Sequence, residues 1–282
     1  MHGSRDGRTL WIGVATFATV FAAWYVLTTV THVIGGGRFP SPAEVWDALR
    51  QITVVGYADA RLPTHILQSA KLVLLGFGAA VCVGVPLGLA MGWSRSVEAF
   101  VNPTFLLIRP IPPLAWIPLA IVWLGLGDAA KILVMWFAAF VPVVINSYAG
   151  VRTIEPHLVE AARTLGVKRW MFVREVLIPG ALPMIFTGLR LSLQACWTTL
   201  VAAELIGAIA GLGHVLSQSA LDIFPAMIVV GMASVAIAGA ALTVLLGVIE
   251  RRAMPWRLDF TLNAARRRNV ARLIDSTPSA AT

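Results

Sequence analysis

Residues 160–179 read E-A-A-R-T-L-G-V-K-R-W-M-F-V-R-E-V-L-I-P and form a charged island between two long apolar runs. Four basic and two acidic side chains lie within these twenty positions, so the island is too polar to cross a bilayer. Gly166 suits the left-handed conformation that ends a helix. Helical spacing before it creates one apolar face, made of Leu158, Ala161, Ala162 and Leu165. The stretch predicts two short helices hinged at a glycine, which is an amphipathic elbow suited to docking a partner.

The composition around this elbow is that of an integral membrane protein. Of 282 residues, 58% are hydrophobic and 13% charged, and the mean hydropathy is +0.80, well outside the range of soluble domains. We expect a single all-α membrane domain with about six transmembrane helices, followed by a basic tail at 250–282 and with the elbow at 155–179. The expected membrane runs are about 10–34, 66–91, 100–124, 130–150, 182–209 and 225–249.

The third run is unusual because it contains five prolines between positions 100 and 124. Proline lacks the backbone N–H that continues a helix, and its ring clashes with the preceding turn. The run therefore predicts a kinked or broken segment instead of one straight helix.

The positive charges are distributed unevenly between the two sides of the membrane. The N-terminus, the loop at Arg95, the elbow with the preceding Arg152, and the tail hold fifteen of the 22 Lys and Arg residues, whereas the opposite side holds Arg38, Arg50 and Arg61. The positive-inside rule then predicts that both termini and the elbow are cytoplasmic, which requires an even number of spans. The net charge of +8 comes mainly from basic residues on the cytoplasmic side, where they can face anionic lipid heads. It does not indicate nucleic-acid binding.

The sequence lacks the motifs of nucleotide and metal chemistry. None of the three lysines follows a glycine as a phosphate-binding loop requires, so we expect no ATP hydrolysis by this chain itself. The histidines are scattered and interpreted as interfacial side chains, without the spacing of a metal site. They are His2, His32, His65, His157 and His214. We expect no catalytic residue, no bound cofactor and no metal.

Two arginines lie inside apolar runs at similar depths, Arg109 in the third run and Arg190 in the fifth. Intramembrane charges commonly face a water-filled path, so one interpretation is that both attract an anion. The alternative is structural: Arg109 binds carbonyls freed by its proline neighbours, and Arg190 fixes a helix crossing. On the fifth run a polar stripe predicts either a pathway lining or an interhelical hydrogen-bond seam. Its members are Arg190, Gln194, Trp197, Val201 and Glu204.

The elbow resembles the EAA motif of ABC importer permeases. The shared features are Glu160-Ala161-Ala162, then Gly166, and the closing 176–179 segment V-L-I-P, in which Val176 and Ile178 replace the usual Ile and Leu. In that family the motif forms the coupling helix that inserts into a groove of the ATPase subunit. The resemblance therefore assigns ATPase coupling to Glu160, Ala161, Ala162, Arg163, Leu165 and Gly166.

Residues 109–119, R-P-I-P-P-L-A-W-I-P-L, and 197–205, W-T-T-L-V-A-A-E-L, are similar to permeases for taurine, aliphatic sulfonates and nitrate. The likeness covers about residues 40–257. It implies a type I importer permease fold in the bacterial inner membrane, a homodimer, and two partner ATP-binding cassette subunits that use ATP and magnesium. It also implies an extracytoplasmic binding protein.

The substrate and the class of protein each leave alternatives. The resemblance favours taurine or another sulfonate as the solute, with nitrate, bicarbonate or a thiamine-pyrimidine precursor as alternatives, because such importers take much of their specificity from the binding protein. A self-sufficient channel or an intramembrane enzyme is the rival from another class. A channel would have no use for the elbow, and an enzyme would need a catalytic pair at membrane depth, where the sequence offers Glu204 and two arginines.

Overall fold

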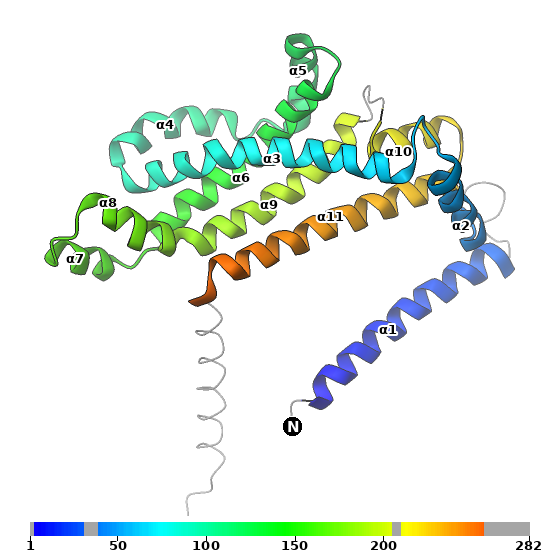
Figure 1. Ribbon diagram of the computed structural model, residues 1–282, viewed down its shortest axis with the longest axis horizontal. Helices are drawn as coiled ribbons and strands as arrows, with labels where there is room; N and C mark the ends of the chain where they lie inside the picture. Colours follow the sequence, from blue (N-terminus) through cyan, green and yellow to red (C-terminus); the bar gives the residue numbers. More distant parts are fainter. Residues whose placement is uncertain (1–2, 31–38, 205–209, 257–282) are drawn as a thin grey trace, which may run out of the picture. The chain divides into compact units, whose positions relative to one another are not determined.

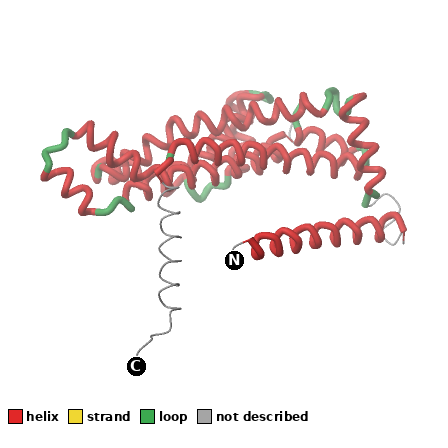
Figure 2. Tube along the Cα trace, turned by 60° about the horizontal axis from the view of Figure 1, so that its bottom comes forward, coloured by secondary structure: helices red, strands yellow, loops and turns green. Residues whose placement is uncertain are grey.

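The computed structural model describes residues 3–30, 39–204 and 210–256, and these ranges are built from helices (Figure 1, Figure 2). The β-type pairing within them is an isolated antiparallel bridge between Tyr57 and Ala60. The predicted all-α fold class is confirmed. The C-terminal part of the predicted basic tail, 257–282, lies outside the described residues, as do positions 31–34 and 205–209 of the predicted membrane runs.

Five helices of the described chain are long and apolar enough to cross a membrane. The first is α1 (Gly3–Tyr25), which continues as the π-helix η1 (Val26–Val30). The others are α3 (Leu62–Trp93), α6 (Asp128–Arg152), α9 (Ile178–Glu204) and α11 (Pro225–Ala253). A sixth crossing is present if a bent helix pair counts as one span.

The bent pair lies where the prolines predict a break. Helix α4 (Arg95–Ile108) ends just before the Arg109-Pro110 step, and the chain resumes as the 3-10 turn η3 (Pro113–Trp116) followed by α5 (Ile117–Leu124). Pro110, Pro112 and Pro113 cannot donate the backbone hydrogen bonds that a continuous helix needs there. The predicted broken segment is confirmed.

Short helices fill the connections between the long ones. Helix α2 (Pro42–Arg50) begins with a capping box between Ser41 and Glu44 and runs into the π-helix η2 (Gln51–Val55). The other short elements are α7 (Pro156–Thr164), α8 (Arg169–Phe172), the π-helix η4 (Val173–Leu177) and α10 (Leu212–Leu221). The predicted elbow at 155–179 is thus occupied by α7, α8 and η4. Helix α7 is a separate short helix that ends near Gly166, whereas α8 and η4 continue without a break into α9, so the second predicted short helix is the start of a longer one.

The chain divides into two compact units, and the long helices α3, α6, α9 and α11 contribute a segment to each. One unit consists of Met1–Gly76, Pro113–Met135 and Cys196–Ala238. The other consists of Phe77–Pro112, Trp136–Ala195 and Gly239–Thr282. The elbow belongs to the second unit and α10 to the first.

In the second unit, small residues let α3 approach α6 closely. Gly84, Gly88 and Gly92 recur every four residues on one face of α3. A Cβ atom added at Gly88 would lie 2.6 Å from the Ser147 Cβ atom, and one added at Gly92 would lie 2.6 Å from the Val151 Cβ atom. Close backbone contact through such small-residue stripes is a common way for membrane helices to associate.

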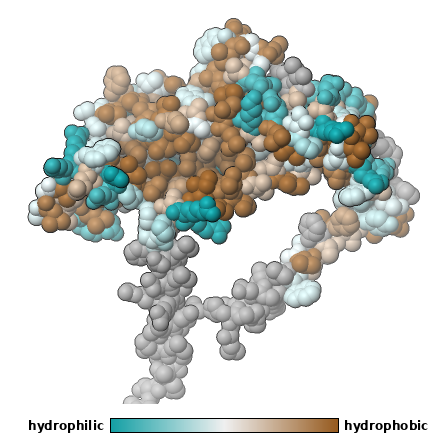
Figure 3. All heavy atoms as spheres, viewed as in Figure 1, coloured by the Kyte–Doolittle hydropathy of each residue, from teal (hydrophilic) through white to brown (hydrophobic). Residues whose placement is uncertain are grey.

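Large apolar side chains remain exposed along the long helices, and Figure 3 shows extensive hydrophobic surface on the face that it presents. Leu67 on α3, Leu191 on α9 and Ile237 on α11 are examples. A water-soluble monomer rarely exposes apolar surface on this scale. The surface therefore agrees with helices that face lipid or a neighbouring subunit.

Candidate coupling elbow and intramembrane polar sites

The elbow helix α7 ends in a glycine turn. Thr164 is the last helical residue, Leu165 is the C-cap, and Gly166 follows with φ +68°. The Gly166 N–H donates to the Arg163 carbonyl at 3.0 Å, and the Val167 N–H donates to the Ala162 carbonyl at 3.1 Å. These two bonds satisfy carbonyls that the helix end would leave free, and the left-handed conformation costs glycine little. The predicted helix end at Gly166 is confirmed.

The apolar face predicted for α7 is mostly uncovered. Ala162 is buried, whereas Leu158 is 50% and Leu165 80% exposed. Glu160, Ala161, Arg163 and Gly166 are exposed as well. The structure therefore places all six predicted coupling residues on one helix and its closing turn, and five of them lie open at the surface.

The helices that flank the elbow, α6 and α9, pack against each other, and the second short helix of the elbow packs against α3. At the base of the elbow, a Cβ atom added at Gly150 of α6 would lie 2.9 Å from the Ala181 carbonyl oxygen of α9. At its second short helix, the buried ring of Phe172 packs on Trp93, the last residue of α3, with ring centroids 4.8 Å apart. The elbow is therefore joined mechanically to three long helices of its unit.

A polar cluster in the same unit joins α4 to the end of α6. Glu98, in the first turn of α4, accepts a hydrogen bond from the Tyr148 hydroxyl at 2.5 Å and forms an ion pair with Arg152. The Arg152 guanidinium also lies over the Tyr148 ring, 5.4 Å from its centroid. This cluster fixes the C-terminal end of α6 just before the elbow begins.

The two predicted intramembrane arginines have different surroundings. Arg109 is the C-cap of α4 at the bend, and its side chain is exposed. Arg190 on α9 is half-exposed and forms an ion pair with Glu250 on α11. The ion pair ties these two helices together, as the structural interpretation of Arg190 requires, and leaves about half of the arginine side chain open.

The remaining members of the predicted α9 stripe differ in exposure. Gln194 is exposed and Val201 half-buried, whereas Trp197 and Glu204 are buried. The Trp197 indole N–H has no hydrogen-bond partner within the described part of the chain. The stripe therefore changes from an exposed to a buried environment along the helix.

Glu204, the last residue of α9, is fully buried and hydrogen-bonded. Its carboxylate accepts from the Ser69 hydroxyl at 2.8 Å and from the Gly213 N–H at 2.7 Å. Ser69 lies on α3, and Gly213 lies in the first turn of α10. The carboxylate thus meets two other helices of its unit.

His65, interpreted from the sequence as an interfacial side chain, lies in the interior of its unit. His65 is fully buried, and its ring bonds to the Gly211 N–H through Nδ1 at 3.0 Å and to the Tyr57 carbonyl through Nε2 at 2.9 Å. Sequence reasoning also missed Ser69, Trp93 and Phe172. For His65 and Ser69, the sequence did offer a signal: the two residues lie one turn apart on one face of α3, and glycines occur at 211 and 213.

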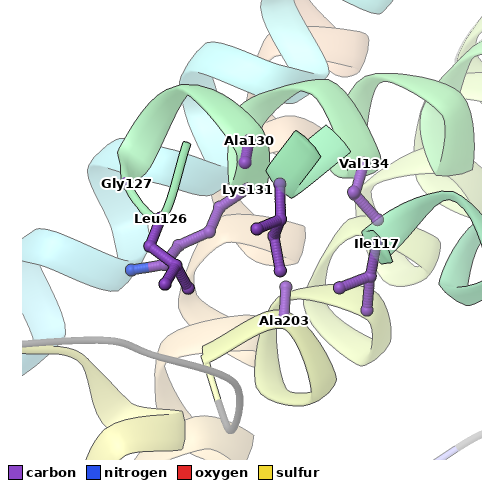
Figure 4. A pocket seen from close by; sticks show the side chains of 8 residues that line it. Ile117, Leu126, Gly127, Ala130, Lys131, Val134 and Ala203 are labelled. Atoms are coloured by element: carbon purple, nitrogen blue, oxygen red, sulfur yellow. The ribbon is translucent and has the colours of Figure 1, made fainter. Parts of the chain in front are cut away.

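A small cavity lies in the first unit among α5, α6 and α9 (Figure 4). Lys131, Leu126 and Ala203 are among its lining residues, and the buried Lys131 ammonium lies 3.7 Å from the Asp128 carboxylate. The cavity volume is about 10 Å³, which is room for one water molecule. A solute of several heavy atoms does not fit in this cavity. Among the described residues there is also no cluster of three His, Cys, Asp or Glu side chains able to hold a metal.

These features define a multi-pass helical membrane protein that presents an exposed amphipathic elbow. Residues 84–256, more than half of the chain, match the family described as binding-protein-dependent transport system inner membrane component. The chain belongs to this family, the inner-membrane permeases of ABC importers. Members of the family are membrane components and not the ATP-hydrolysing subunits.

Related proteins resemble the chain over most of its length. The taurine transport system permease protein TauC of Escherichia coli is 37% identical, over 88% of this chain and 90% of that protein. The putative aliphatic sulfonates transport permease protein SsuC of Bacillus subtilis is 31% identical over 88% of both chains. The nitrate import permease protein NrtB of Synechocystis sp. is 29% identical, over 84% of this chain and 87% of that one.

The fold agrees with a solved permease structure. An inward-facing structure of the MetNI methionine ABC transporter aligns with a TM-score of 0.51 and 22% identity, over 64% of this chain and 94% of that chain. At this level of identity the match concerns the fold alone. It confirms the predicted type I importer permease fold.

Proposed function

We propose that this permease carries a small anionic or zwitterionic solute into the cytoplasm by ATP-driven alternating access, with taurine or another sulfonate as the first candidate. The observation that carries the proposal is the elbow, in which α7 presents Leu158 and Leu165 uncovered while the Gly166 turn and the Phe172–Trp93 contact hold it on the membrane helices. An exposed apolar helix face that is rigidly attached to the membrane helices suits a docking element. The similarity to TauC and SsuC supports the choice of solute.

The proposed assembly contains two copies of this chain, two ATP-binding cassette subunits and one extracytoplasmic binding protein. ATP and magnesium belong to the cassette subunits, which are expected to receive the elbows in surface grooves. When ATP closes the cassette pair, the two elbows move together and the membrane helices open outward to accept the solute; hydrolysis resets them. The distribution of Lys and Arg supports cytoplasmic termini and a cytoplasmic elbow, with the basic tail against anionic lipid.

We further propose that the exposed polar part of α9 faces the translocation pathway. Arg190 and Gln194 are open at the surface of the described chain, and Arg109 is open at the α4 bend. An arginine at membrane depth that remains half-exposed beside its ion pair can still attract an anion. Trp197 and Glu204 were predicted as lining residues too, and their burial favours a structural contribution in the state described.

The first test is uptake by the complete transporter in proteoliposomes, with labelled taurine delivered by the binding protein encoded with this chain. ATP-dependent accumulation that unlabelled alkanesulfonates suppress would support a sulfonate importer. Suppression by nitrate or bicarbonate instead would assign the chain to those solutes, which the similarity to NrtB makes the second candidate. Accumulation without ATP or the cassette subunits would favour a self-sufficient channel and overturn the proposal.

A further inference from the structure

Three consecutive backbone N–H groups at the start of α10 bond to three different side chains. The Gly211 N–H donates to His65 Nδ1 at 3.0 Å, the Leu212 N–H to Ser69 Oγ at 2.8 Å, and the Gly213 N–H to Glu204 Oε2 at 2.7 Å. The first N–H groups of a helix have no partner within the helix. Here each one is satisfied by a side chain from another helix, since His65 and Ser69 belong to α3 and Glu204 ends α9.

The three acceptors are fully buried and connected to one another or to the backbone. The Ser69 hydroxyl accepts from Leu212 and donates its own proton to Glu204 Oε1 at 2.8 Å. His65 Nε2 lies 2.9 Å from the Tyr57 carbonyl, so this nitrogen carries the proton and Nδ1 is free to accept from Gly211. Because every polar atom is used, removing one partner leaves another buried group unsatisfied.

The glycines on either side of Leu212 leave room for this arrangement. Gly211 has φ +143°, a conformation that side chains rarely adopt, and a Cβ atom there would collide with the Glu204 carboxylate. A Cβ atom at Gly213 would lie 2.6 Å from the Glu204 Cβ atom. The segment 211–213 is thus shaped around Glu204.

The other end of α10 is held as well. Asp222, which follows the helix, accepts hydrogen bonds from the Tyr57 hydroxyl at 2.5 Å and from the Gln218 amide at 3.0 Å. The Tyr57 ring also packs edge-on against Phe224, with centroids 6.2 Å apart. Because Tyr57 bonds to His65 through its carbonyl and to Asp222 through its hydroxyl, the two ends of α10 share one polar network.

We propose that Ser69 and Glu204 are positioning residues that clasp the N-terminus of α10, so that α10 moves as one body with the adjoining segments of α3 and α9. This inference rests on the proposed function, because the motion in question is that of alternating access. Glu204 then acts on transport through α10 and not by touching the solute. The geometry supports this role because both carboxylate oxygens are engaged and buried, and exposing them to a solute would require breaking the contacts with α3 and α10.

The test compares Ser69→Ala and Glu204→Ala with a matched control, Ser192→Ala. Ser192 is also a fully buried helix serine, but its hydroxyl donates to the Ala139 carbonyl and takes no part at α10. Glu204→Gln is the milder variant, since its carbonyl can still accept from Gly213 while its amide disrupts the Ser69 bond. Each variant is assembled with the cassette subunits and binding protein, and folded complex is quantified before measurement.

The first readout is hydrogen exchange at the amides of 211–213 in the complete transporter. The wild type should protect these amides, and Ser69→Ala should speed exchange of Leu212 by about tenfold or more, the scale expected when a buried hydrogen bond to a charged network is lost. Ser192→Ala should leave them unchanged. Fast exchange of all three amides in the wild type, or no acceleration in Ser69→Ala, would overturn the clasp.

The second readout is ATP hydrolysed per solute imported. The clasp predicts an increase of about tenfold for Ser69→Ala and Glu204→Ala and a smaller one for Glu204→Gln, with less than twofold for Ser192→Ala. An unchanged ratio in both alanine variants, or a changed KM for solute with an unchanged ratio, would overturn the positioning role. A wild-type complex that imports no solute would instead refute the proposed function, and hydrogen exchange would still decide whether the clasp exists.

Discussion

Trp93 and Phe172 lie with their ring centroids 4.8 Å apart and their planes inclined by 34°, so that the last residue of α3 rests on the second helix of the elbow. The contact is buried on the Phe172 side, whereas the adjacent Trp170 is 73% exposed. A movement of the elbow therefore reaches α3 through this ring pair as well as through the covalent chain into α9.

Replacing either ring should weaken the mechanical link more than it harms the fold. Aromatic pairs contribute about 0.5–1.5 kcal/mol beyond their burial, so Phe172→Leu and Trp93→Leu should each lower the melting temperature modestly. We expect uptake per ATP to fall several-fold in both variants. Trp170→Leu is the control, because it removes an exposed aromatic ring from the same short helix without touching the ring pair. Equal uptake per ATP in Phe172→Leu and wild type would show that the ring pair does not pass movement of the elbow to α3.

The Arg190–Glu250 ion pair allows the structural and anion-binding roles of Arg190 to be separated. Arg190→Ala leaves the mostly buried Glu250 without this ion pair and should reduce the yield of folded transporter. Combining Arg190→Glu with Glu250→Arg restores the opposite charges and should recover folding. Because the arginine is then on α11, we expect the KM for solute to stay raised. Recovery of a wild-type KM by the charge swap would assign Arg190 a structural role alone.

Ile223 occupies the position after the α10 C-cap where glycine is usual. Its φ is +52°, its N–H donates to the Ala220 carbonyl and the next N–H donates to the Ser219 carbonyl. A left-handed conformation costs an L-residue roughly 1–2 kcal/mol, and Ile223 is 83% exposed, so little packing offsets it. Ile223→Gly should raise the melting temperature in detergent. Leu221→Gly, at the last residue of the helix, should lower it, by no more than the roughly 1 kcal/mol that glycine costs in a helix interior. A lower melting temperature for Ile223→Gly would contradict this account of the turn.

His214 should make the transporter less stable in acid. Burial of the imidazole is the main cause that lowers the pKa of His214 from its ordinary 6.5, and its interaction with the nearby His65 ring adds to this, against a smaller opposing effect of Asp59. The unfolded chain therefore binds more protons than the folded chain as pH falls through 6.5, and stability is lost in that range. His214→Gln should reduce the drop in melting temperature between pH 7.5 and 5.5. An identical drop in His214→Gln and wild type would contradict the shift.

Local chemistry made much of the fold predictable. Hydropathy located the long helices, the prolines between 100 and 124 located the bend, and Gly166 located the end of the elbow helix, because each of these signals depends on neighbours in sequence. The close approach of α3 to α6 through Gly84, Gly88 and Gly92 was present in the sequence as a repeat, but its partner helix could not be identified without tertiary structure.

The polar sites were less predictable because their partners are distant in sequence. Ser69 and Glu204 are 135 positions apart, and His65 and Gly211 are 146 apart. Helical spacing grouped Glu204 with Arg190 as one stripe, yet the two differ in burial because the neighbours of α9 change along its length. Periodicity reports which face a residue occupies and not what covers that face.

The central claim is that the elbow delivers the energy of ATP hydrolysed by another subunit to this chain. The most direct measurement is simultaneous ATP hydrolysis and taurine uptake by reconstituted transporter, comparing wild type with Glu160→Lys on the exposed face of α7 and with Glu175→Lys, the same charge change outside α7. The account predicts coupled uptake in wild type and Glu175→Lys, and at least about a tenfold loss of uptake per ATP in Glu160→Lys at equal amounts of folded permease. Wild-type coupling in Glu160→Lys would contradict the central claim.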